Sequence, residues 1–290
     1  YNEWNWYEAE LHLSFYFPPD TTITFTIDAA LPDQFGNKLG KVATGKIITT
    51  GYEPEVRFSG GTGIVEADGD RRVPIEAMNY EGVNLGMRKL AVNEIVPLLN
   101  DQNVFYGRQA PPLPLTVQTR LSFGKKRNFW NLRPIELKHS LGADSTGVVF
   151  VQVDASRPNN QRYIRGLYQV THLGLTAKFS PRNNLVFVTN MKDASPVANA
   201  KIEVRDDGNK ILWSGATDAQ GRCETPGWAE LNIPARSQWD QPRAWIFARK
   251  GNDLAFLHSE WGTGIYPYRF GIDYEWNPQP LVRTGVVMTD

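Results

Sequence analysis

Short runs in which apolar and polar residues alternate recur along the whole chain, a pattern typical of β-strands with one buried face. Apolar residues alternate with others at 11–17, and the same period returns at 23–27 after a Pro18-Pro19-Asp20 break. Turn-forming residues at 33–37 and a short strand-like run at 45–50 follow. We therefore expect a first β-domain that ends at about residue 53.

A second region, residues 54–157, has the strand spacing of a β-sandwich. The expected strands lie at 56–58, 73–78, 85–92, 115–123 and 148–153. Residues 93–103 fit either a helical turn or an irregular excursion. The sequence RPNN at 157–160 resembles a linker, because proline and asparagine disfavour a continued strand. We expect a second boundary there.

The third region, 158–280, shows the cleanest alternation, with residues 200, 202 and 204 facing one way and 201, 203 and 205 the other. Turns are expected at 206–209 and 217–221, and the runs 244–249 and 254–259 are expected to pair around Gly251. No window keeps a helical i, i+3, i+4, i+7 pattern for three turns. The fold class expected is all-β, with tandem antiparallel β-sandwich domains.

Composition adds limits on function. The chain has 290 residues, which predicts two or three domains, and its 31 basic and 31 acidic side chains give no net field for a nucleic acid. The densest basic run, Lys125 to Arg127, is interpreted as a solvated turn. The single cysteine, Cys223, excludes an internal disulfide and a Cys-based zinc site with the usual paired spacing. Residues 1–10 lack a signal-peptide pattern, and both ends fall in strand-like runs, so we expect an internal segment of a longer protein.

Candidate chemistry is sparse. The four histidines lie in or beside strand patterns, and packing or solvation is favoured over catalysis or metal binding for each. The His258-Ser259-Glu260 sequence puts an imidazole and a carboxylate on one strand face, which is a weak signal without further ligands. The histidines are His12, His139, His172 and His258.

Other motifs are incomplete. The glycine-rich stretches 60–63 and 262–264 are interpreted as turns, since neither has a phosphate-binding sequence. Asp68-Gly69-Asp70 lacks the remaining oxygen ligands of a calcium loop. Cys223 is interpreted as a buried, inert thiol, and a glycosidase-like carboxylate pair stays open. We predict no catalytic, metal or cofactor-binding residue, no cofactor and no enzyme.

Nine tryptophans leave one alternative open. Large aromatics fill sandwich cores and the seams between domains, which is the favoured interpretation, but aromatic platforms also bind sugars and peptides. An adhesin-like or carbohydrate-binding β-sandwich array therefore remains the second hypothesis. The aromatic residues that raise it are Trp4, Trp6, Trp228, Trp239, Trp261, Tyr266, Tyr268, Tyr274 and Trp276.

Several motifs in a fixed order carry a family resemblance. The sequences YQVTHLGLT at 168–176, LVFVTN at 185–190 and SPVANAKI at 195–202 are followed by TDAQG at 217–221. This order resembles a macroglobulin domain of bacterial alpha-2-macroglobulins. Residues 283–290 are similar to the first strand of that family's following domain, and 31–50 resemble a bacterial Ig-like domain.

The resemblance implies four units: an Ig-like domain at 1–53, whole or incomplete, macroglobulin-type sandwiches at 54–157 and 158–280, and the start of another domain at 281–290. It implies a structural segment of a periplasmic inhibitor that traps endopeptidases in bacterial defence. The partners implied are endopeptidases, met through the full-length parent, and neighbouring macroglobulin domains. Any membrane anchor would belong to the parent.

In many members of the family an internal thioester couples to the attacking protease, within a Cys-x-Glu-Gln motif. Cys223 is followed by Glu224-Thr225-Pro226 and departs from that motif, so the thioester role is not transferred to it. The chain also offers no identifiable bait region. The resemblance thus implies that the reactive chemistry of such an inhibitor lies outside this segment.

Overall fold

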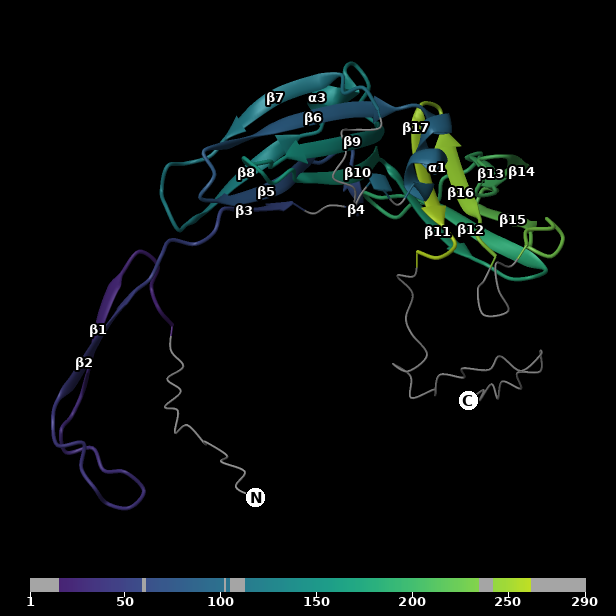
Figure 1. Cartoon of the computed structure of the whole chain (residues 1–290). Coiled ribbons are helices and arrows are strands. Elements are labelled where there is room, and N and C mark those ends of the chain that lie inside the picture. The colour runs from purple at the N-terminus through teal and green to yellow at the C-terminus, as the bar shows by residue number, and fades with distance from the viewer. Residues whose placement is uncertain (1–15, 59–60, 102, 105–112, 235–241, 262–290) are drawn as a thin grey trace.

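The computed structural model describes residues 16–58, 61–101, 103–104, 113–234 and 242–261. Most of the strand expected at 11–17, the glycines at 262–264 and the run at 283–290 lie outside these ranges. Strands dominate the described chain, and the all-β prediction is confirmed. Figure 1 shows a two-stranded arm extending from a body built of several sheets. No helix in the described ranges is long and apolar enough to cross a membrane.

The arm, residues 16–50, is built on β1 (Thr22–Ile27) and β2 (Ala43–Ile48), which pair antiparallel. Their register places Ile23 opposite Ile47 and Phe25 opposite Gly45, so apolar residues share one face. The Phe25 ring lies over Gly45, where an added Cβ would come within 2.0 Å of the ring. Within the described residues this face stays open, with Phe25 39% exposed and Ile47 40% exposed. Such a hairpin is marginally stable unless something packs on it.

The second region contains two sheets that enclose a common core. One has the order β3 (Glu55–Phe58), β5 (Arg72–Met78), β8 (Trp130–Glu136). The other has the order β4 (Gly61–Glu66), β10 (Tyr163–Thr171), β9 (Gly147–Asp154), β6 (Gly82–Leu90), β7 (Val117–Ser122). The five predicted strands of this region are present, as β3, β5, β6, β7 and β9. Ile75 and Ile135 meet Val149 and Val151 in the core between the sheets.

Two features of this region differ from the sequence-based expectations. The glycine-rich stretch expected as a turn begins β4 at Gly61, and this strand runs parallel to β10. The Tyr168 ring lies on Gly63, where a Cβ would come within 2.9 Å of it, so glycine here accommodates a side chain from the neighbouring strand. β8 was not expected, because its exposed positions around Pro134 obscure the alternation.

The expected linker at 157–160 is a tight turn between β9 and β10. The backbone N–H groups of Arg157 and Asn160 each donate to the other residue's carbonyl oxygen, and Asn159 takes a positive φ of 66°. β10 then pairs with β9 and β4, inside the second region. The strand pairing therefore changes sheet at His172 rather than near residue 157. The domain limits themselves stay a prediction.

The third region also has two sheets. One has the order β11 (Leu173–Lys178), β12 (Asn183–Asn190), β15 (Arg222–Pro226). The other has the order β14 (Ile211–Ala216), β13 (Lys201–Arg205), β16 (Trp245–Lys250), β17 (Asp253–His258). Val186 and Val188 meet Ile202 and Ile246 between them. The predicted pairing of 244–249 with 254–259 corresponds to β16 and β17.

The uncertain stretch 93–103 contains a helix, α1 (Val92–Asn100), and a second short helix, α3 (Lys138–Leu141), follows β8. The Glu94 carboxylate accepts from the Ala91 backbone N–H at 2.8 Å, which satisfies a donor at the first turn of α1. At nine residues, α1 is too short to hold the helical pattern for three turns. Sequence periodicity alone could not separate it from an irregular loop.

Candidate functional site

The junction between the second and third regions is a buried apolar cluster to which both contribute. α1 and strands β9 and β10 supply one side of it, and β16 and β17 supply the other. Phe247 and Phe256 stack at its centre, with ring centroids 5.5 Å apart. The buried members are Leu90, Ile95, Val96, Leu98, Val104, Val148, Phe150, Leu167, Trp245, Phe247, Leu254 and Phe256. We name this set the shared core.

Two strands at the junction are buried on both faces. On β9, Val149 and Val151 face the core of the second region, whereas Phe150 faces the shared core. On β16, Ile246 faces the core of the third region, whereas Phe247 faces the shared core. The four sheets of the body therefore stack with an apolar layer between each pair of neighbours. This packing makes the two regions one body.

A carboxylate ties the two regions together where the chain passes from β10 to β11. Asp253, at the start of β17, accepts from the Thr171 hydroxyl at 2.7 Å, the His172 backbone N–H at 2.9 Å and His172 Nδ1 at 3.0 Å. The Leu254 backbone N–H adds a bond of 2.8 Å. His172 Nε2 lies 3.2 Å from an Asp68 carboxylate oxygen in the turn after β4. His172 thus bridges carboxylates from both regions.

A buried glutamine makes a second link across the junction. The Gln169 side-chain amide donates to the Phe256 carbonyl oxygen at 2.9 Å, and its oxygen accepts from the Phe256 N–H at 2.8 Å. Gln169 is 2% exposed. Its side chain therefore satisfies the backbone groups that β17 leaves unpaired at this position, as a neighbouring strand would.

A charged group lies beneath the shared core on β13. Glu203 is paired with Lys201 at 2.6 Å and with Arg205 at 2.5 Å, and the Arg205 guanidinium lies 4.4 Å from the Phe247 ring centroid. Burial alone would raise the pKa of Glu203, but the bonds from Lys201 and Arg205 outweigh it and lower the pKa below its ordinary range. The carboxylate is thus held ionised and fixes the Arg205 side chain against the core.

A cavity of about 570 Å³ opens beside the shared core, between β10 and the β16–β17 pair. Its charged groups bond to the chain itself: Arg243 pairs with Glu260 at 2.9 Å, and Arg165 donates to the Gln152 side chain at 2.7 Å. Trp245 is buried, and Trp261 meets it edge to face at 5.6 Å. These two tryptophans pack against the body, which favours the core-and-seam interpretation for them.

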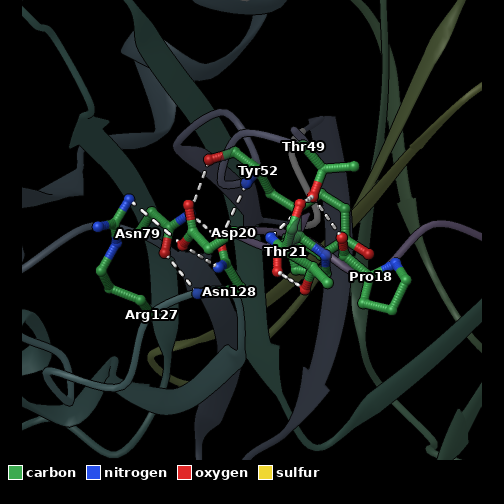
Figure 2. Close-up of polar contacts among 9 residues, drawn as sticks. Pro18, Asp20, Thr21, Thr49, Tyr52, Asn79, Arg127 and Asn128 are labelled. Carbon is green, nitrogen blue, oxygen red and sulfur yellow. Dashed lines mark hydrogen bonds and ion pairs between the residues drawn. The ribbon is translucent and has the colours of Figure 1, made fainter. Parts of the chain in front are cut away.

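The arm meets the body through a different kind of junction, shown in Figure 2. Asn128 accepts from the Tyr52 N–H at 2.9 Å and donates to the Asp20 carboxylate at 2.7 Å. Asn79 donates to the Tyr52 carbonyl oxygen at 2.7 Å and accepts from the Asn128 N–H at 2.7 Å. We name Asp20, Tyr52, Asn79 and Asn128 the clasp. Its bonds join the arm, the linker to β3 and two turns of the second region.

Comparisons with known proteins agree with this fold. Residues 170–277 match the bacterial alpha-2-macroglobulin MG3 domain, and the match begins where β10 leads into β11. An alpha-2-macroglobulin homolog of Nostoc sp. (strain PCC 7120) is 26% identical over 292 residues, which cover 94% of this chain and 15% of the relative. The predicted resemblance to bacterial alpha-2-macroglobulins is confirmed. The chain spans about 15% of the length of the curated alpha-2-macroglobulin relatives it matches.

Solved alpha-2-macroglobulin structures share the fold. A crystal structure of native Escherichia coli alpha-2-macroglobulin spanning domains MG0-NIE-MG1 has a TM-score of 0.60 and 15% identity, covering 84% of this chain and 76% of that one. Trypsin-activated E. coli alpha-2-macroglobulin has a TM-score of 0.52 and 15% identity, covering 71% of this chain and 14% of that one. At this identity the likeness concerns fold alone.

The four histidines of the chain do not come together in one site, and the three that the structure describes lie in three separate environments. His12 lies outside the described residues, and His139 is exposed on α3. His172 belongs to the junction, and His258 is buried with its ring 4.4 Å from the Trp245 ring. Among the described residues no group of three or more histidine, cysteine or acidic side chains is arranged to hold a metal ion.

The other residues that the sequence raised as candidates for a functional site make contacts that stabilise the fold, where the structure describes them. Asp68, weighed as part of a calcium loop, bonds His172 instead. Cys223 is buried on β15, and burial, with a contribution from Asp218, raises the pKa of its thiol. A raised thiol pKa opposes nucleophilic reactivity, in line with the inert-thiol interpretation. Trp4, Trp6, Trp239 and the aromatic residues at 266–276 lie outside the described ranges.

The junction residues were missed by the sequence analysis. Asp253 belongs to none of the motifs of the sequence, and Gln169 lies within the 168–176 motif without any sign of its partner. The bonds that these two side chains make across the junction join residues 81 to 87 positions apart. One signal was present: the run AWIFA at 244–248 is apolar without alternation, which is typical of a strand buried on both faces. Such a run predicts that a second layer covers the sheet.

Proposed function

We propose that this chain is a scaffold segment of a bacterial alpha-2-macroglobulin that traps endopeptidases. The observation that carries the proposal is the shared core, because it makes two macroglobulin-type sandwiches one stiff body. A protein that rearranges around a protease needs parts that keep their shape while others move. This segment would hold neighbouring domains in register, with the reactive groups located elsewhere in the parent.

Three further observations support the proposal. One structural relative is described as trypsin-activated, which connects that protein to an endopeptidase. The buried Cys223 thiol lacks both the family's thioester motif and the exposure that a reactive cysteine needs. The open apolar face of the arm offers a surface for a neighbouring domain of the same parent. On this proposal the parent acts in the periplasm.

The full-length parent incubated with trypsin provides the test. We expect trypsin to lose activity towards a large protein substrate such as casein while it still hydrolyses a small peptide substrate, because a trapped protease is screened from large molecules only. Trypsin incubated with this 290-residue chain alone is the control, and it should keep both activities. Digestion of the parent with casein hydrolysis undiminished would overturn the proposal.

A further inference from the structure

Three residues of unusual backbone geometry meet where the arm joins the body. Asp20, Asn79 and Asn128 all have positive φ, at 50°, 55° and 58°. They come from three separate turns: before β1, after β5 and before β8. Left-handed backbone in residues other than glycine is uncommon, and such residues gather at clamps and switch regions. Here they are joined to one another by the side-chain bonds of the clasp.

The linker passes through the clasp at very close range. A Cβ on Gly51 would lie 2.9 Å from an Arg127 guanidinium nitrogen, 3.1 Å from the Asn128 side-chain oxygen and 3.2 Å from an Asp20 carboxylate oxygen. A side chain here would displace the Arg127 guanidinium and press on Asn128 and Asp20, so glycine lets the linker pass without disturbing these groups. Next to it, both backbone polar groups of Tyr52 are bonded, its N–H by Asn128 and its carbonyl by Asn79.

The clasp contrasts with the junction inside the body. The three buried apolar clusters formed by the described residues contain no residue of the arm. Ion pairs add little, since Arg127 and Asp20 are 3.6 Å apart with both side chains largely exposed, and Glu53 next to Arg157 is 90% exposed. The direction of the arm therefore depends on hydrogen bonds to a few residues, and not on packing.

We propose that the clasp is a releasable latch, and that residues 51–54 form the hinge about which the arm turns when the latch opens. The clasp selects one arm direction because its amides fit the Tyr52 backbone in one geometry only. When the Asn128 side chain is removed, residues 51–54 still join the arm to the body, but the arm can take several orientations relative to the body. The body does not change, because the shared core lies far from the clasp along the stack of sheets. This inference does not depend on protease trapping.

Distances between two spin labels on the full chain test the latch. One label replaces Thr24 on the exposed polar face of β1, the other replaces Thr119 on β7, and Cys223→Ala removes the native thiol. In the otherwise unchanged chain we expect one narrow distance distribution. Asn128→Gly removes the clasp amide and still permits positive φ, so the fold should be kept while the distribution broadens at least twofold.

Asn199→Gly is the matched control, because it makes the same change at an exposed positive-φ asparagine of the third region, away from the clasp and the hinge. Its distribution should match that of the parent chain. Asn79→Gly is a second route to the open state, since it removes the amide that donates to the Tyr52 carbonyl oxygen and still permits positive φ. Circular dichroism checks that each variant is folded. An unchanged narrow distribution in both Asn128→Gly and Asn79→Gly would overturn the proposal.

Discussion

Phe247→Ala is expected to lower the free energy of unfolding by about 3–5 kcal/mol. Phe247 is fully buried on β16, stacks on Phe256 and lies beneath the Arg205 guanidinium. Truncation removes these contacts and leaves a cavity between two sheets that are fixed by their own cores, so neighbouring side chains can fill it only in part. Urea denaturation followed by circular dichroism gives the change in free energy.

Phe35→Ala is the matched control for this prediction. Phe35 lies in the loop of the arm and is 80% exposed, so the same truncation there should change stability by no more than about 0.5 kcal/mol. Phe247→Ala should also destabilise the second region, although the residue belongs to the third. Loss of stability confined to the third region would contradict the shared core.

Asp253→Ala should have the next largest effect, a loss of about 2–4 kcal/mol in the free energy of unfolding. The carboxylate is 12% exposed and accepts four hydrogen bonds, among them one from the fully buried Thr171 hydroxyl. Alanine leaves these donors without an acceptor where water has little access. His172 loses the bond that orients its ring towards Asp68.

Asp70→Ala is a suitable comparison for Asp253→Ala. Asp70 lies in the turn before β5, is 83% exposed and makes only a long ion pair of 3.6 Å with Arg72. Its replacement should be nearly neutral in thermal and urea denaturation. Equal effects of the two substitutions would show that the bonds of Asp253 contribute nothing specific to the junction.

The strands could be predicted from the sequence because alternation is a local property. The pattern at 200–205 identified β13 with the correct inward face, and Ile202 is indeed buried. Which strands share a sheet is not local. β10 was assigned to the third region, but its partners are β9 and the distant β4, whose glycines hide its strand character. Pairing between distant strands follows from packing, which no short window reveals.

The junction was still less predictable. His172 was expected to pack or face solvent, and nothing near it in sequence indicates that Asp253, 81 residues away, would accept from its ring and its backbone. The clasp combines residues separated by as many as 108 positions. Such contacts are set by the fold as a whole, whereas the order of local turn and strand motifs was enough to indicate the family.

Hydrogen exchange of the native chain, read by mass spectrometry, tests most directly whether the two sandwiches form one body. If they do, amides of β9 and β16 exchange with the same opening free energy, and Phe247→Ala lowers this free energy equally in both strands. If β16 opened at a clearly lower free energy than β9, or if Phe247→Ala affected β16 alone, the two sandwiches would be independent and the scaffold proposal would lose its basis.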